Sequence, residues 1–157
     1  MDKIEKILKN DIYKESLNRL ATYEEKREFC RHDLKHFVDM ARIAYIMVLE
    51  KNLDYSKEVI YAIGLLHDIG RALQYEKGIP HHKASVDLSK EILRDIDFTE
   101  DENNIILKAI ENHREQSEDE LSSIIYKSDK LSRECFNCKV IKECYWSDEK
   151  KNLSIKY

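Results

Sequence analysis

Glycine and proline are scarce in this chain, which has three glycines and one proline among 157 residues. Domains built from many short strands need such residues at their turns, so the sequence argues against an all-β fold. It contains neither a signal peptide nor an apolar run of the roughly 18 residues that a membrane-spanning helix needs. We therefore expect a soluble, cytoplasmic protein without a membrane partner.

An excess of one charge is also missing. The chain has 27 basic and 31 acidic residues, which gives a net charge of −4 although charged residues make up 37% of the sequence. The two signs are interspersed, without a basic stripe for nucleic acid or an acidic block typical of disordered tails. A small-molecule partner is therefore expected in preference to nucleic acid, and the composition is compatible with a homo-oligomer.

Helical periodicity, by contrast, runs through most of the chain, and no segment reads as a strand. Helical segments are predicted over residues 1–26 (two short outer helices), 33–51, 56–70, 82–94, 99–113 and 117–132, with N-caps at Ser56, Thr99 and Ser117. Residues 134–157 look irregular and contain three cysteines. The sequence predicts a single all-α domain over residues 1–157, a compact bundle of about six or seven helices.

The stretch from Ile60 to Arg71 organises this bundle. Ile60, Ile63, Gly64 and His67 recur at i, i+3, i+4 and i+7, so they share one helix face. That face ends in His67-Asp68, and Gly70 should end the helix. A neutral nitrogen beside an anionic oxygen suits a divalent metal. The alternative is a core histidine paired with its neighbouring carboxylate.

Three other helices carry ligand-type side chains on apolar faces. His36 continues the line of Met40, His113 ends an apolar face, and Asp129 follows Ile125 by about one turn. Each alone is more often a hydrogen-bonded core group. Four such positions in one small domain favour a shared metal site, because unpaired buried charge is costly.

The order His36, His67-Asp68, Asp129 resembles the HD superfamily of metal-dependent phosphohydrolases. The segments Leu65–Gly70 and Ser128–Leu131 look like its central and closing signatures, and the resemblance covers residues 30–133. It implies an enzyme that hydrolyses a nucleotide or related phosphoester or phosphoanhydride. It also implies a divalent ion, iron or manganese, held by His36, His67, Asp68 and Asp129. The competing reading is a non-catalytic module that senses a nucleotide or metal.

Two further positions resemble the subgroup that holds two metals, which includes the symmetric diadenosine-tetraphosphate hydrolases. His81 stands four residues before Ser85, as in that subgroup, and His113 closes a helix. The resemblance implies that they hold a second ion, with Asp68 as the bridging group. His82 competes with His81. Residues 71–80 differ from the subgroup, which leaves the substrate open.

Basic residues next to these ligands are candidates for phosphate binding. Arg114 and Lys130 each follow a ligand directly, so they join Asp68 as candidate catalytic residues. Arg71 is a further candidate, whereas Lys83 reads as a solvated charge.

The cysteines form a separate pattern. Cys135, Cys138 and Cys144 are closely spaced, and Cys30 precedes the helix of His36. Because the helices of His36 and Asp129 must meet, Cys30 can approach the other three and complete a structural zinc or iron–sulfur site. His32 can replace Cys30 in that set, and four unlinked thiols are the alternative. Tyr145 and Trp146 are expected to pack the C-terminal segment.

Overall fold

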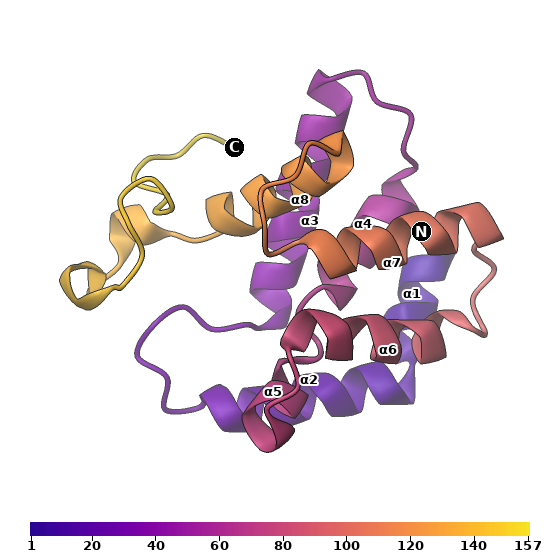
Figure 1. The fold of residues 1–157 in the computed structure, drawn as a ribbon, viewed down its shortest axis with the longest axis horizontal. Helices are drawn as coiled ribbons and strands as arrows, with labels where there is room; N and C mark the ends of the chain where they lie inside the picture. Colours follow the sequence, from indigo (N-terminus) through magenta and orange to yellow (C-terminus); the bar gives the residue numbers. More distant parts are fainter.

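The computed structural model describes all 157 residues and contains helices but no strand, which confirms the all-α prediction. No helix is both long and apolar enough to cross a membrane. Figure 1 shows the arrangement of the eight α-helices: α1 Asp2–Lys9, α2 Asp11–Glu24, α3 Leu34–Glu50, α4 Lys57–Leu66, α5 Arg71–Lys77, α6 His81–Leu93, α7 Glu100–Asn112 and α8 Glu120–Leu131.

Helices α3 and α4 form the centre of the bundle. Helix α3 packs against α4 and α8, and α4 also packs against α7. Gly64 permits the close approach of α4 to α3, because a Cβ there would lie 2.6 Å from Ala41 Cβ. The fully buried Phe37, Met40 and Ile63 surround this contact. The apolar stripes read from the sequence therefore do face one core.

The helix caps agree with the sequence at two of the three predicted positions. Ser56 caps α4, and Thr99 forms a capping box with Glu102 at α7. At α8 the prediction of Ser117 is wrong. Asp119 is the N-cap there and accepts from the Ser122 N–H, while the Ser117 hydroxyl accepts from the Asp119 N–H. The serine belongs to the turn that precedes the helix.

Helices α1 and α2 belong to the core more than the sequence suggested. They are two short helices, as predicted, but Ile7 and Leu20 are fully buried and Tyr13 nearly so. Helix α1 contacts α4 and α2 contacts α5. Their outer faces are strongly charged. The apolar pattern in the sequence is therefore weak, although the inner faces are well buried.

The helix α4 ends earlier than predicted, at Leu66, so His67 and Asp68 lie in a turn. Gly70 precedes α5, a short helix in a segment for which the sequence pattern predicted none. A Cβ at Gly70 would lie 2.4 Å from Ser85 N, and the Gly70 N–H donates to Ser85 Oγ at 2.9 Å. The turn therefore rests directly on the first part of α6.

The C-terminal segment, residues 134–157, projects from the end of α8 beside the loop that joins α2 to α3 (Figure 1). It is irregular apart from two short 3-10 turns, Cys135–Asn137 and Ile141–Glu143. The buried Asn152 amide donates to the carbonyls of Leu131 and Arg133 at 2.8 and 3.0 Å. Side-chain hydrogen bonds thus hold this segment against the end of α8.

Candidate metal centre

Six buried His and Asp side chains meet around the carboxylate of Asp68. Their ligand atoms form two groups, within each of which all atoms lie within 4.8 Å of one another. The first group contains His36, His67, Asp68 and Asp129, and the second contains Asp68, His81 and His113. Both groups are fully or almost fully buried. Asp68 is the side chain that they share.

The distances within the groups are short. Asp129 Oδ1 lies 3.2 Å from His36 Nε2 and 3.8 Å from His67 Nε2. Asp68 Oδ2 lies 3.3 Å from His67 Nε2. The other oxygen, Asp68 Oδ1, lies 3.3 Å from His81 Nε2 and 3.5 Å from His113 Nε2. The two oxygens of Asp68 therefore face different histidines.

Backbone carbonyls fix the tautomers of two histidines. His67 Nδ1 lies 2.8 Å from Gly64 O, and His113 Nδ1 lies 2.6 Å from Ile110 O. Because a carbonyl oxygen only accepts, Nδ1 must carry the hydrogen in each ring. In the neutral rings the Nε2 lone pairs then face Asp68.

The same assignment follows for the other two rings. His81 Nδ1 lies 2.7 Å from Gln74 Oε1. His36 Nδ1 lies 2.9 Å from Ser132 Oγ, whose own hydrogen goes to the Asp129 carbonyl. In all four rings Nδ1 serves as the donor, which orients Nε2 toward the carboxylates as metal ligation requires.

Two buried atoms in this centre make no well-aligned hydrogen bond, His67 Nε2 and Asp68 Oδ1, although Arg71 Nε lies 2.9 Å from the latter. Neutral imidazole lone pairs directed at carboxylate oxygens repel them unless a cation lies between. Imidazole nitrogens mixed with carboxylate oxygens suit divalent first-row metals. The donor set therefore fits the divalent metal that the sequence pattern predicts.

Cationic neighbours keep both carboxylates ionised. Burial would raise the pKa of Asp68, but Arg71, whose Nε lies 2.9 Å from Oδ1, and His67 hold that pKa well below its usual range. Burial acts in the same direction on Asp129, where contacts with His36, His67 and the adjacent Lys130 keep the pKa low. Both carboxylates are thus ionised at neutral pH.

The histidines respond differently to their surroundings. Burial lowers the pKa of His36 to about 3 and that of His81 to about 2, so both are neutral donors. Burial also disfavours the charged form of His67, yet Asp68 and Asp129 outweigh it and raise its pKa to about 9. The two carboxylates therefore stabilise a positive charge, here the proton on the imidazole, at His67 Nε2.

Arg133 competes for one of these nitrogens. Its Nη2 donates to His36 Nε2 at 2.9 Å, while Nη1 donates to the Arg31 carbonyl. The same Nε2 lone pair would bind an ion, so metal binding requires the guanidinium to move away from it. This contact links the centre to the loop that carries Cys30.

The structure separates the two adjacent histidines. His81 lies against Asp68, whereas His82 faces a different hollow beside Glu111 and Arg114. Of the predicted cations, Arg114 and Lys130 line a cavity of about 320 Å³ over the centre, together with His81, His113 and Asp129. Arg71 also reaches this cavity while paired with Asp68. Lys83 is exposed, as expected for a solvated charge.

The C-terminal segment contributes to that cavity, which the sequence pattern did not indicate. Tyr145, Trp146 and Lys150 line it, beside Tyr126 from α8. Lys130 Nζ lies 4.7 Å from the centre of the Tyr126 ring and 5.4 Å from that of Trp146. Tyr145 is 79% exposed. The expectation that Tyr145 and Trp146 only pack the segment is therefore too narrow.

His32 is a second side chain that sequence reasoning missed at this centre. Its Nδ1 lies 2.6 Å from Glu24 Oε1, and its Nε2 lies 3.8 Å from Asp68 Oδ2. The suggestion that His32 replaces Cys30 as a ligand does not fit, because both nitrogens face carboxylates. No signal in the sequence indicated this contact, because the partner, Glu24, is buried on another helix, α2.

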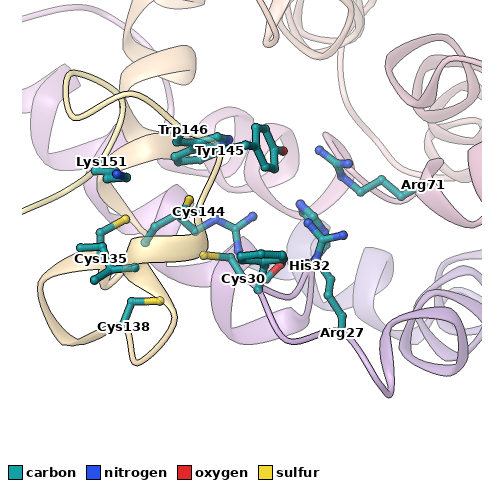
Figure 2. Close-up of a pocket in the computed structure, with 13 residues that line it drawn as sticks. Arg27, Cys30, His32, Arg71, Cys135, Cys138, Cys144, Tyr145, Trp146 and Lys151 are labelled. Atoms are coloured by element: carbon teal, nitrogen blue, oxygen red, sulfur yellow. Dashed lines mark hydrogen bonds between the residues drawn. The ribbon is translucent and has the colours of Figure 1, made fainter.

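The four cysteines line another cavity, of about 70 Å³, beside the His/Asp centre. Figure 2 shows Cys30 on the side of the α2–α3 loop, opposite Cys135, Cys138 and Cys144 of the C-terminal segment. His32, Arg71 and Arg133 line the same cavity. None of the cysteines forms a disulfide, and Cys135 is buried.

Comparison with known proteins gives a consistent picture. Residues 33–134 match the HD domain family. An uncharacterized protein of Clostridium beijerinckii is 46% identical over 157 residues, the full length of both chains. Ribonuclease Y of Mycoplasma mycoides subsp. mycoides is 28% identical over 125 residues, 78% of this chain and 23% of the relative. Ribonuclease Y of Syntrophomonas wolfei is 30% identical over 109 residues, 69% of this chain and 19% of the relative. The chain thus spans about a quarter or less of the length of these two ribonucleases. No solved structure matches it significantly.

Proposed function

The chain belongs to the HD-domain family, whose members are generally metal-dependent phosphohydrolases, and on that premise we propose that it hydrolyses a nucleotide or a related phosphoester or phosphoanhydride. One observation carries the proposal. Two groups of ligand-type atoms share Asp68, and members of both groups, Asp129, His81 and His113, line a cavity that also presents cations and aromatic rings. Such a cavity offers complementary contacts to a phosphate and to a base.

The ligand assignment is part of the proposal. His36, His67, Asp68 and Asp129 would hold one divalent ion, iron or manganese, and His81 and His113 would hold a second with Asp68 between them. Bound in pairs, such ions lower the pKa of a bridging water and stabilise both oxygens of an in-line displacement at phosphorus. Asp68 is central because its two oxygens face different histidines.

The side chains over the centre would orient the substrate. Arg114 and Lys130 present cations to the cavity that contains His113 and Asp129, which suits the phosphate oxygens. Tyr145 and Trp146 line the same cavity, and an aromatic face there can stack on a base. Nucleotides are therefore better candidates than phosphate esters without a ring.

The test is hydrolysis of a panel of nucleoside mono-, di- and triphosphates, dinucleoside polyphosphates and a short RNA, with the products separated by chromatography, because cleavage within a dinucleoside polyphosphate or an RNA releases no free phosphate. Metal-depleted protein is assayed before and after addition of Mn²⁺ or anaerobic Fe²⁺, with Asp129→Asn as the inactive control. Metal-dependent hydrolysis of a nucleotide supports the proposal. Cleavage of RNA alone would move the substrate toward that named in Ribonuclease Y. Binding without turnover on any compound would favour a nucleotide- or metal-sensing module instead.

A further inference from the structure

The cysteine cavity adjoins the His/Asp centre but contains none of its six ligand-type residues. It brings together thiols from two segments that are distant in sequence, the α2–α3 loop and the C-terminal segment. All four cysteines of the chain lie there, and none is bridged to another. Four buried or half-buried thiols that share no ligand would not be expected to converge on one cavity from two distant segments. We infer that Cys30, Cys135, Cys138 and Cys144 ligate an iron–sulfur cluster.

The spacing of the sulfur atoms favours a cluster over a single zinc ion. Four thiolates at about 2.3 Å from one zinc ion lie about 3.8 Å apart. Every group of three or more ligand atoms within 4.8 Å of one another belongs to the His/Asp centre, and no cysteine is in either group. An iron–sulfur cluster separates its cysteine ligands more widely, because its own irons and sulfides lie between them.

The size and lining of the cavity agree with that occupant. About 70 Å³ is several times the volume that one water needs, about 10–15 Å³ on the same measure. Phe29, Ile141 and Trp146 supply apolar walls that limit the access of solvent, which would protect a cluster. The site is therefore roomy and partly screened from water.

Basic side chains around the cavity would offset the negative charge of the thiolates. Arg27, Arg133 and Lys151 line it together with the cysteines. Arg27 Nε donates to the Cys30 carbonyl at 2.8 Å, and Arg133 donates to the Arg31 carbonyl. These contacts fix the loop that carries Cys30, so one wall of the cavity is held independently of the C-terminal segment.

The cluster would join the C-terminal segment to the α2–α3 loop. The residues next to Cys144 are Tyr145 and Trp146, which also reach the cavity over the His/Asp centre. Fixing Cys144 therefore fixes one wall of that cavity. The inference stands without the proposed hydrolysis, because sulfide content does not depend on substrate turnover.

The experiment uses full-length protein purified without oxygen and measures iron, acid-labile sulfide, zinc and accessible thiols. We expect iron and sulfide in equal amounts beyond the iron of the His/Asp centre, a broad visible absorbance and no freely titratable thiol. Iron without sulfide, one equivalent of zinc without sulfide, or four titratable thiols in the native protein would each overturn the inference.

Two variants separate the centres. Cys138→Ser should lose the sulfide and the visible absorbance while keeping the helical circular dichroism. Asp129→Asn should lose metal from the His/Asp centre and keep the sulfide. Retention of full sulfide in Cys138→Ser would exclude Cys138 as a ligand and contradict the four-cysteine set. The wild-type measurements decide the inference even if a variant fails to fold.

Discussion

The His/Asp centre and the cysteine cavity lie side by side, but their ligand-type residues belong to different kinds of secondary structure. The side chains of the first project from α3, α6 and α8 or from the ends of α4 and α7, whose other faces form the apolar core. The cysteines stand on a loop and an irregular segment with two short 3-10 turns. Apolar packing can hold the first set in place by itself. The second set depends on hydrogen bonds such as those of Asn152 and, in our inference, on the cluster.

The largest effect is expected from a change at the His/Asp centre. Asp68→Asn removes the charge that both ligand groups share, so hydrolysis should fall by more than the roughly 10–100-fold typical of losing a mere outer-shell partner. The amide keeps the volume of the carboxylate, so the helical circular dichroism should remain. Metal content and phosphate release are measured together. Full activity at unchanged metal content would contradict the role of Asp68.

Two neighbouring histidines, His81 and His82, provide a matched test of the His/Asp centre. His81→Ala should reduce metal occupancy or turnover by about 10–100-fold, because His81 Nε2 faces Asp68. His82→Ala should remain within about threefold of wild type, because His82 faces away from Asp68. The reverse order of severity would show that the start of α6 is rotated by one residue.

The contribution of the C-terminal segment to the cavity over the His/Asp centre is tested by Trp146→Ala. A stacking contact with a base is worth about 1–3 kcal/mol, so KM for a nucleotide should rise by about tenfold. The metal content of the His/Asp centre should stay unchanged, since Trp146 is not among its ligand-type residues. Phe136→Ala, in the same segment but outside this cavity, is the control. An unchanged KM for Trp146→Ala would exclude base stacking there.

Anchoring of the segment is tested by Asn152→Ala. The change leaves two carbonyls without their amide donor and should weaken the local attachment by about 1–3 kcal/mol. Limited proteolysis should then cut within residues 134–157 sooner, whereas urea unfolding followed by helical circular dichroism should change little. Asn104→Ala, at an exposed site on α7, is the control. Equal loss of stability in both regions would mean that they unfold as one unit.

The smallest effect concerns the acid stability of the helical part. Contacts with Lys108 and with Ser122 lower the pKa of Asp119 to about 2. The stabilisation by its charge is therefore present above the unfolded pKa of about 3.9 and is lost as the pH falls through about 2. Asp119→Asn should keep the cap at pH 7 and show a weaker decline between pH 4 and pH 2. Asp119→Ala should cost about 1 kcal/mol at pH 7. Urea unfolding at several pH values gives both results, and an unchanged acid dependence in Asp119→Asn would contradict the assignment.

The sequence predicted best those features that repeat along a helix. His36, His113 and Asp129 were recognised because each continues an apolar face, and the structure brings all three to Asp68 or His67. Periodicity could not separate His81 from His82, because the contact of Gly70 with Ser85 decides which residue at the start of α6 faces inward. Helix α5 is too short, at seven residues, to display a period.

Residues outside regular helices were harder to place. Tyr145 and Trp146 stand in a segment without periodicity, so nothing in their spacing indicated a cavity. His32 depends on Glu24, which comes from another helix, and such a pairing is visible only in three dimensions. Asp119 was missed as a cap because Ser117 and Asp119 are both good N-cap residues, and only the backbone path selects between them.

The contact of His36 with Asp129 also determines when the His/Asp centre can form during synthesis of the protein. His36 lies on α3 and Asp129 on α8, so the two can meet only after α8 has left the ribosome. Closing so long a loop costs several kcal/mol of chain entropy, which the packing of α3 on α8 must offset first. Cys144 emerges later still. The complete set of His and Asp side chains is therefore available to a metal ion only once α3 and α8 have packed together.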